Sequence, residues 1–338
     1  MPKLTGFLSI RCLHGYAAAV AAIAAVAAGV MVTGAQAADA PFPSKPIRFI
    51  LGYPPGGASD AVARLLVGPL TARLGQQIVI ENRPGAGGNI AGEIVARSAP
   101  DGHTWFLGNN GILATNQALY QKMPFDSVRD FATVVLIATQ PSVLVTHPSL
   151  PVKNVKELVA LAKARPGQLN YASSGTGTAG HLAGELFKGL AGVNYQHIPY
   201  KGGGPAVIDL VSGHVHFMFA TAASVIPHAR SGRLRALAVT SAQRSPSVPD
   251  LPTVAEGIPG FEALTWHGIV VPAATPAAVI SKINAEMNAA LATGELKDRL
   301  ATQGVEARGG KPEEFAAFLR AEIPKWSKVV RDSGAKAD

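Results

Sequence analysis

The stretch KPIRFILGYPPGGASDAVARLLVGPLTARLG, residues 45–75, decides the fold class. It opens with a β-rich run, KPIRFILGY, and a glycine- and proline-rich loop follows at 54–57. Apolar residues then recur at helical spacing, at Val62, Leu65, Leu66, Leu70 and Leu74. The stretch therefore predicts a strand, a tight loop and a helix that begins near residue 58.

The segments after residue 75 continue this alternation. QIVIEN (77–82) reads as a strand, GGNIAGEIVARS (87–98) as a helix and HTWFLGN (103–109) as a strand. Such a βαβαβ opening predicts an α/β fold with a parallel sheet covered on both faces. Further strands are predicted at 132–140, 142–147, 168–174, 195–200, 214–220 and 233–241. Further helices are predicted at 155–167, 178–192, 203–213, 275–293, 294–304 and 311–334, with Pro324 expected to kink or break the last one.

The first 37 residues differ from the rest of the chain. Lys3 and Arg11 are their only charged residues, and an uncharged run at 16–32 precedes an A-x-A site that ends at Ala37. This pattern predicts a secretory signal peptide, cleaved after Ala37, in preference to a transmembrane anchor. Cys12 is the only cysteine and would leave with the signal peptide, so the mature protein would hold no disulfide. These features predict an exported, periplasmic protein of the Gram-negative type.

The overall composition is that of a globular protein. Hydrophobic residues make up 48% of the chain and charged residues 15%. Loss of Lys3 and Arg11 with the signal peptide lowers the net charge from +8 to +6. The basic residues are scattered, without a Lys- or Arg-rich run. We therefore expect a mild attraction for anions and no binding to nucleic acid.

A second glycine-rich loop lies in NYASSGTGTAGHLAGE, residues 170–185. Gly175, Gly177 and Gly180 spell G-x-G-x-x-G between a predicted strand and a predicted helix. A dinucleotide site also needs an acidic residue about twenty positions further on, and the segment 195–200 contains neither Asp nor Glu. No cofactor is expected, and an NAD(P)-dependent enzyme remains the weaker alternative.

The same loop also fits an anion-binding site. Glycines let backbone N–H groups approach a ligand, and a helix N-terminus favours a carboxylate or phosphate. The loop at 52–57 has the same form, and Ser59 or Asp60 lies at the start of the helix that follows. Asp60 is equally well explained as a helix-capping residue. Two such helix starts, one in each half of the chain, predict a ligand held between two domains.

Catalytic and metal sites have little support in the sequence. The G-x-S-x-G motif of serine hydrolases is absent. His214 and His216 form an H-x-H pair, but no H-E-x-x-H motif or cysteine ligand accompanies them. His267, beside Trp266, either lines a pocket or packs in the core. We therefore expect no catalytic residue, no bound metal and no enzyme activity.

Seven ordered motifs resemble the Bug-type solute receptors, the periplasmic substrate-binding proteins of tripartite tricarboxylate transporters. They run the length of the mature chain, which makes the set more specific than any one member. The motifs are GYPPGGASDAVAR (52–64), IENRPGAGGNIAGE (80–93), MPFDSVRDF (123–131), YASSGTGTAGHLAGELF (171–187), HIPYKGGGPAVIDLVSGHV (197–215), GRLRALAVTSAQRSPSVPDLPTVAEG (232–257) and WHGIVVPAATP (266–276).

This resemblance implies a two-domain periplasmic-binding-protein fold, type II-like, with a ligand cleft between the domains. One domain would be discontinuous, formed by 38–142 and 261–338, and the other would be 143–260. Hinge closure would trap a small organic carboxylate and deliver it to integral-membrane transporter subunits. The protein is expected to be a monomer. A periplasmic sensor that signals to a membrane partner would share this cleft, so uptake and signalling stay open.

The resemblance also carries a set of ligand-binding residues. From the first domain these are Tyr53, Gly57, Ser59 and Asp60, with Asn109 as a weaker candidate. From the second domain they are Ser174, Gly175, Thr178 and His181, with Asp209 as a weaker candidate. Which carboxylate they select depends on pocket shape, which the sequence does not reveal.

Overall fold

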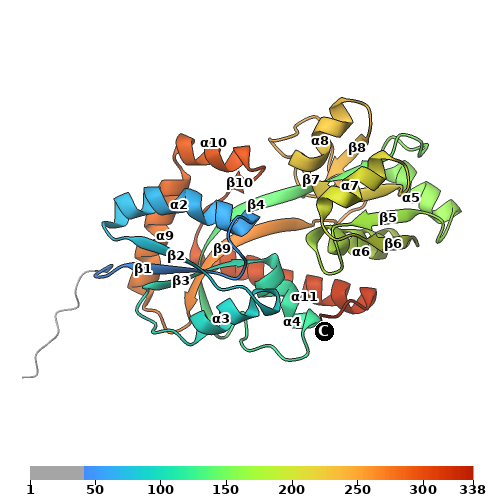
Figure 1. Cartoon of the computed structure of the whole chain (residues 1–338). Helices are drawn as coiled ribbons and strands as arrows, with labels where there is room; N and C mark the ends of the chain where they lie inside the picture. The colour runs from blue at the N-terminus through green and yellow to red at the C-terminus, as the bar shows by residue number, and fades with distance from the viewer. Residues whose placement is uncertain (1–41, 338) are drawn as a thin grey trace, which may run out of the picture. The chain divides into compact units, whose positions relative to one another are not determined.

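The opening stretch folds as its sequence predicts, in a computed structural model that describes residues 42–337 (Figure 1). Strand β1 (Ile47–Leu51) leads through the loop at 52–57 into helix α2 (Ala58–Leu74). Strand β2 (Ile78–Asn82), helix α3 (Asn89–Ala96) and strand β3 (Thr104–Asn109) follow. Strand β1 pairs in parallel with both β2 and β3. The predicted βαβαβ unit is therefore confirmed, but the predicted parallel sheet is in fact mixed, because β9 (Leu264–Pro272) pairs antiparallel with β3.

The remaining elements include several that the sequence pattern did not predict: the π-helix η3, the short helix α4, helix α8 and strands β9 and β10. In chain order the elements are η2 (Ala86–Gly88), η3 (Gly111–Thr115), α4 (Asn116–Leu119), β4 (Phe131–Thr146), α5 (Val155–Ala164), β5 (Asn170–Ser173), α6 (Ala179–Ala191), β6 (Gln196–Pro199), α7 (Gly203–Val211), β7 (Phe217–Thr221), α8 (Ala222–Arg230), β8 (Arg235–Val239), η4 (Val254–Glu256), β9 (Leu264–Pro272), α9 (Ala277–Leu291), α10 (Gly294–Thr302), β10 (Glu306–Ala307) and α11 (Pro312–Ser333).

Strand β4 joins two sets of strands. Its first part, up to Pro141, pairs with β9, and its last part, from Ser142, pairs with β7 and β8. The strand order is β2-β1-β3-β9-β4-β7-β5-β6. We call β2, β1, β3, β9 and the first part of β4 the first sheet, and the last part of β4 with β7, β8, β5 and β6 the second sheet. Figure 1 shows β4 and β9 lying side by side, with opposite directions.

The strand directions determine where the two glycine-rich loops, 52–57 and 174–178, begin. Strand β9 is antiparallel to both β3 and β4, so β1 and β3 run in the same direction as β4, toward the second sheet. Strand β7 is antiparallel to β4, and β5 is parallel to β7, so both run back toward the first sheet. The carboxyl ends of β1 and β3 therefore face those of β5 and β7, which is where ligands bind in open α/β sheets.

The hydrophobic core lies on both faces of the first sheet. On one face, α2, α9 and α10 bury Leu66, Met287 and Leu300 against the strands. On the other face, α11 buries Phe315 and Trp326 in a cluster that continues to residues of the second sheet. Helices α7 and α8 cover the opposite face of the second sheet. Each loop is thus attached to elements that a buried core holds in place.

Two predicted interruptions, one between strands and one within a helix, are corrected. The predicted strands 132–140 and 142–147 form one strand, because Pro141 lies where β4 changes partners and its missing N–H interrupts no pairing. Helix α11 continues through Pro324 instead of breaking there. Buried Leu319 and Trp326, before and after this proline, hold the helix against the core and outweigh the hydrogen bond lost at Pro324.

Residues from Phe42 onward form one compact unit. The division into domains at 143 and 260 therefore stays a prediction. The predicted signal peptide, with Cys12, lies outside the described residues. Within residues 42–337, no helix is both long and apolar enough to cross a bilayer.

Candidate functional site

The start of α2 is an uncapped helix N-terminus. Its N-cap residue, Gly57, has an extended backbone and offers no side-chain hydrogen bond to the first turn. The backbone N–H groups of that turn also lack helical partners, because the first four N–H groups of any helix do. The loop 52–57 that precedes it contains no Lys or Arg. An anion at this position would thus be bound by N–H groups and the helix dipole.

Asp60 holds the first loop in shape. Its carboxylate accepts hydrogen bonds from Arg64 at 2.7 and 3.2 Å, from the Gly56 N–H at 3.0 Å and from Asn82 at 3.2 Å. The hydrogen bond from Arg64 is the largest of the effects that lower the pKa of Asp60. Asn82 also donates to the Tyr53 carbonyl at 2.9 Å. Both carboxylate oxygens are therefore engaged within the protein.

Ser59 faces a histidine from a distant part of the chain. Its Oγ lies 3.0 Å from Nε2 of His267, which comes from β9. Ser59 is 7% exposed and His267 1% exposed. Burial lowers the pKa of His267 to about 4, so its imidazole is neutral at pH 7.

Asn109, at the end of β3, pairs with His267 in the sheet register. Its Oδ1 accepts the backbone N–H of Ile112 at 3.0 Å, which begins the turn into η3. Burial raises the pKa of Tyr53, and a side-chain hydrogen bond with Asn109 opposes the rise. Tyr53, Ser59 and Asn109 thus lie around the ends of β1 and β3, as predicted for a shared site, but their binding roles stay a prediction.

The second loop, 174–178, uses glycine where the backbone requires it. Gly175 and Gly177 have φ values of +138° and +78°, which side chains rarely tolerate. Thr178 is the N-cap of α6: its Oγ1 accepts the His181 N–H at 3.4 Å and donates to the Gly175 carbonyl at 2.7 Å. Unlike Gly57, Thr178 therefore satisfies one of the free N–H groups at the start of its own helix.

A pair of stacked histidines supports this loop. His181 accepts the Gly177 N–H on Nδ1 at 3.0 Å, and its ring stacks on His197 with centroids 4.1 Å apart. His197 Nε2 in turn lies 2.7 Å from Oγ of Ser173. Burial, with a smaller effect of His197, lowers the pKa of His181 to about 4. The structure thus places His181 under the loop, whereas Ser174 and Gly175 form the loop itself.

Asp209 lies apart from these loops, on α7. Its carboxylate accepts the Tyr200 hydroxyl at 2.7 Å and is 3.4 Å from Nδ1 of His214. The two histidines of the H-x-H pair have different partners: His214 faces Asp209, and Nδ1 of His216 accepts the Asn170 N–H. Within the described residues, no three His, Cys, Asp or Glu side chains converge to hold a metal ion.

Each loop is built within its own half of the chain. Across residues 42–337, no hydrogen bond joins 52–60 to 174–181; the two loops are related by the facing strand ends. The residues that the sequence analysis left out of the site are His267, His197 and Asn82. Asn82 contacts Tyr53 of the first loop, whereas His267 contacts Ser59 on α2 and His197 contacts Ser173 on β5. The pattern W-H-G in the last motif was the only signal for His267.

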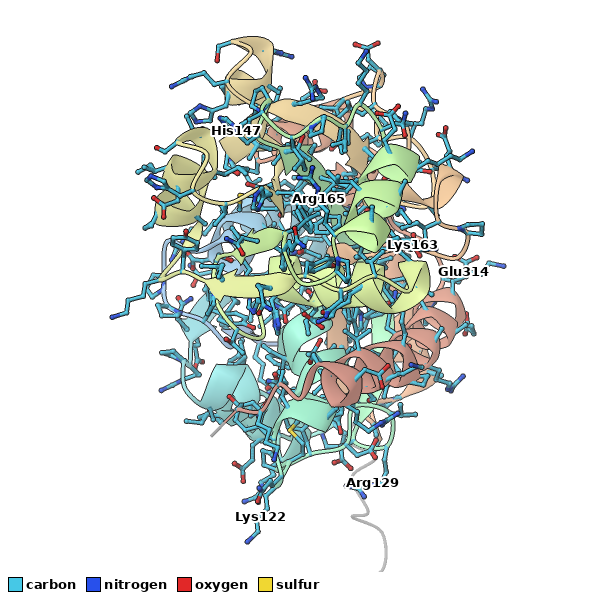
Figure 2. The ribbon with its side chains drawn as sticks, turned by 90° about the vertical axis from the view of Figure 1, so that its right-hand side faces the viewer. Lys122, Arg129, His147, Lys163, Arg165 and Glu314 are labelled. Atoms are coloured by element: carbon cyan, nitrogen blue, oxygen red, sulfur yellow. The ribbon has the colours of Figure 1, made fainter. Side chains whose placement is uncertain are left out.

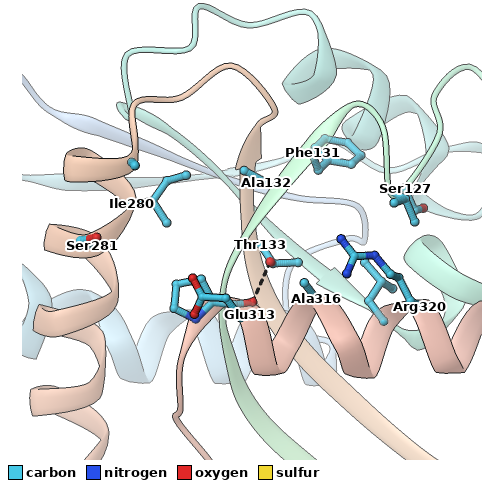
Figure 3. A pocket seen from close by; sticks show the side chains of 13 residues that line it. Ser127, Phe131, Ala132, Thr133, Ile280, Ser281, Glu313, Ala316 and Arg320 are labelled. Carbon is cyan, nitrogen blue, oxygen red and sulfur yellow. Dashed lines mark hydrogen bonds between the residues drawn. The ribbon is translucent and has the colours of Figure 1, made fainter.

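A groove of about 280 Å³ lies elsewhere, between β4, α9 and α11 (Figure 3). Phe131, Ile280 and Leu319 line it, and the Thr133 hydroxyl donates to the Pro312 carbonyl beside it. None of the predicted site residues lines this groove. Glu313 and Arg320, both on α11, line the groove as well and give it one charge of each sign (Figure 3).

Basic side chains are spread over the surface. In Figure 2, Lys122 and Arg129 project at one end of the view, whereas Lys163 and Arg165 lie nearer its middle. The loop 174–178, like 52–57, contains no basic residue. The scattered positive charge can attract an anion to the molecule. At the two loops themselves, the anion would be contacted by uncharged N–H and O–H donors.

The family of this chain follows from its similarity to known proteins. A sequence profile described as the tripartite tricarboxylate transporter family receptor matches residues 62–335. The chain is 42% identical over 300 residues to the "UPF0065 protein in tcbD-tcbE intergenic region" of Pseudomonas sp. strain P51, covering 88% of this chain and 89% of that one. It is 39% identical over 297 residues to Protein BugT of Bordetella pertussis, covering 87% and 91%.

Solved structures share the fold. R. palustris Rpa4515, solved with adipate, is 38% identical, with a TM-score of 0.70 and coverage of 87% of this chain and 98% of that one. MatC (Rpa3494) from Rhodopseudomonas palustris, with bound malate, is 33% identical, with a TM-score of 0.67 and coverage of 86% and 100%. The α/β periplasmic-binding-protein fold is thereby confirmed. The chain belongs to the tripartite tricarboxylate transporter receptor family, the Bug-type periplasmic solute receptors, which bind their ligands and are not enzymes.

Proposed function

We propose that this protein binds a small organic carboxylate between the loops 52–57 and 174–178 and delivers it to integral-membrane transporter subunits. The observation that carries the proposal is the uncapped start of α2 at Gly57, which leaves N–H donors at the positive end of a 17-residue helix. Ser59 adds a buried hydroxyl at the same helix start. Relatives solved with adipate and malate support a carboxylate as the ligand.

The second loop would supply the other contacts. Ser174 and the backbone of Gly175 lie at the carboxyl end of β5, which points toward the first sheet. The discontinuous domains, 38–142 with 261–338 and 143–260, are part of this proposal, and the change of partner in β4 at Pro141–Ser142 supports the first boundary. Ligand would favour a closed arrangement, because only there do both loops contact it.

The remaining predicted residues have supporting parts in this proposal. Tyr53 and Asn109 line the first half of the site. Asp60, Thr178 and His181 shape the loops, and Asp209 acts through Tyr200, whose hydroxyl it holds. Export through the signal peptide 1–37, and action as a monomer, complete the proposal.

The test is a thermal-shift series on protein that has been unfolded and refolded to remove any co-purified ligand. Adipate, malate and citrate are compared with an amino acid, nicotinate and a neutral diol. A rise in Tm for at least one carboxylate, and none for the diol, is expected. If no carboxylate raises Tm, the proposal is wrong.

A variant pair tests the second loop. Ser174→Ala is expected to lower carboxylate affinity several-fold and to leave Tm of the empty protein unchanged, because Ser174 contributes no cap. Thr178→Ser is the matched control, since it keeps the hydroxyl that caps α6. Isothermal titration measures both. Equal affinity in Ser174→Ala and wild type would remove this side chain from the proposed site.

A further inference from the structure

Ser59 and His267 form a buried pair whose hydrogen-bond direction has a consequence for the ligand. Their Oγ–Nε2 distance is 3.0 Å, and His267 is the only side-chain partner of the Ser59 hydroxyl among residues 42–337. The other ring nitrogen of His267, Nδ1, is buried and has no hydrogen-bond partner among the described residues. The pair is thus an isolated contact of one hydroxyl with one imidazole.

A neutral imidazole carries one N–H and one bare nitrogen, so two arrangements exist. If Nδ1 carries the proton, a buried N–H group is left without an acceptor, and Nε2 accepts the Ser59 proton. If Nε2 carries the proton, it donates to Ser59, and only a bare acceptor is left unpaired at Nδ1. Buried N–H groups without partners are rarer in proteins than underused acceptors, so the second arrangement is favoured.

We propose that His267 is a positioning residue that donates its Nε2–H to Ser59 Oγ and thereby leaves the Ser59 O–H free to donate to a ligand carboxylate. A serine hydroxyl has one proton, and a donor on its oxygen prevents that proton from being used toward His267. Ser59 lies in the first turn of α2, beside the N–H groups that begin at Gly57. The Ser59 O–H then joins the N–H groups that this helix start can offer to a negatively charged ligand.

The inference deepens the proposed function and rests on it for the ligand, but the tautomer can be measured without any ligand. Long-range ¹H–¹⁵N correlation spectra of the ligand-free ¹⁵N-labelled protein at pH 7 distinguish the two tautomers, with His267→Gln identifying the resonance. An Nε2-protonated ring is expected. An Nδ1-protonated ring overturns the inference, and no packing role of His267 predicts either result.

The second measurement is affinity for adipate and malate by isothermal titration. Ser59→Ala and His267→Phe are each expected to weaken binding about tenfold, the effect of losing one hydrogen bond to a charged group. The double variant should bind no worse than Ser59→Ala alone, because His267 acts on the ligand only through the Ser59 hydroxyl. His267→Gln, which keeps a donor at the position of Nε2, should stay within about twofold of wild type. Additive losses, or wild-type affinity in His267→Phe, contradict the inference.

Two controls separate the possible failures. If His267→Phe does not fold, as judged by circular dichroism, His267→Gln and Ser59→Ala decide the outcome: loss of affinity in the Gln variant equal to that in Ser59→Ala contradicts the role of the donor. If wild-type protein binds none of the carboxylates, the proposed function fails, and the tautomer measurement still decides the state of the pair.

Discussion

The loops 52–57 and 174–178 look alike in sequence but are supported in different ways. The first is held by an ionised side chain, Asp60, which binds Arg64 and the Gly56 N–H. The second is held by the neutral stack of His181 and His197. The helix after the first loop begins without a side-chain cap, whereas Thr178 caps the helix after the second. Similar glycine patterns therefore do not imply equal roles in binding.

From this difference we predict unequal contributions of the two loops to ligand binding. The helix after the first loop, α2, has no side-chain cap at its start. The carboxylate of Asp60 fixes the loop before it. At the second loop, Thr178 and His181 make hydrogen bonds within the protein, so fewer polar groups of this loop are available to a ligand. We expect the first loop to supply most of the affinity and the second to complete the site on closure.

The largest effect is expected from the packing beneath the second loop. A side chain at Gly184, on α6, would overlap the ring of Tyr171, which is fully buried. Gly184→Val should lower the free energy of unfolding by about 3 kcal/mol, as overpacked cores do. Gly68→Ala on α2 is the control, because its new Cβ meets nothing within 4 Å. Urea unfolding measures both, and equal stability of the two variants would contradict this packing.

A smaller loss in the free energy of unfolding is expected from removing the charge of Asp60, which holds the first loop. Asp60→Asn should cost about 2 kcal/mol, because a buried carboxylate loses hydrogen bonds from charged and neutral donors. Asp332→Asn removes an exposed pairing with Lys328 and should cost less than about 0.5 kcal/mol. Unfolding curves at pH 7 test the contrast. A loss at Asp60 no larger than that at Asp332 would show that the ion pair does not support the loop.

The pH dependence should follow the buried histidines. His181 and His267 have folded pKa values of about 4, below the ordinary 6.5. Between these values the unfolded chain binds more protons than the folded one, so stability falls as pH decreases from 6.5 toward 4. We expect a loss of about 2 kcal/mol per imidazole between pH 7 and pH 5. Unfolding at both pH values measures it.

A variant sharpens this test. His181→Gln should reduce the difference in stability between pH 7 and pH 5, because it removes one of the two buried rings. His214→Gln, which replaces a largely exposed ring, is the matched control. If both variants keep the full difference, the second loop is not the source of the pH dependence.

The smallest change in stability should come with a large change in binding. Gly57 has φ −82° and ψ 175°, which a serine can adopt. Gly57→Ser adds a cap to α2 and should raise the free energy of unfolding by a few tenths of a kcal/mol. Its hydroxyl would also occupy an N–H group needed by the ligand, so carboxylate affinity should fall. A stabilised variant with unchanged affinity would exclude this helix start from the site.

Local patterns predicted the loops and the helices that follow them, because proline, glycine and apolar spacing act over a few residues. They did not predict β9 as a strand, because its partners β3 and β4 lie far away in the sequence. The same holds for the groups that orient the loops. Ser59 and His267 are 208 positions apart, and nothing near either residue indicates the other. Asp60 was explicable as a cap, and only the structure shows that it also binds Asn82.

The position of β9 has a consequence for biosynthesis. This strand lies between β3 and β4, yet it follows both by more than a hundred residues, so their facing edges stay unpaired until residues 264–272 exist. Chains are made from the N-terminus, and non-local strand pairing is slow. The first sheet therefore cannot finish folding while most of the chain is being made. This late central strand therefore delays compaction of the first sheet until residues 264–272 have been made.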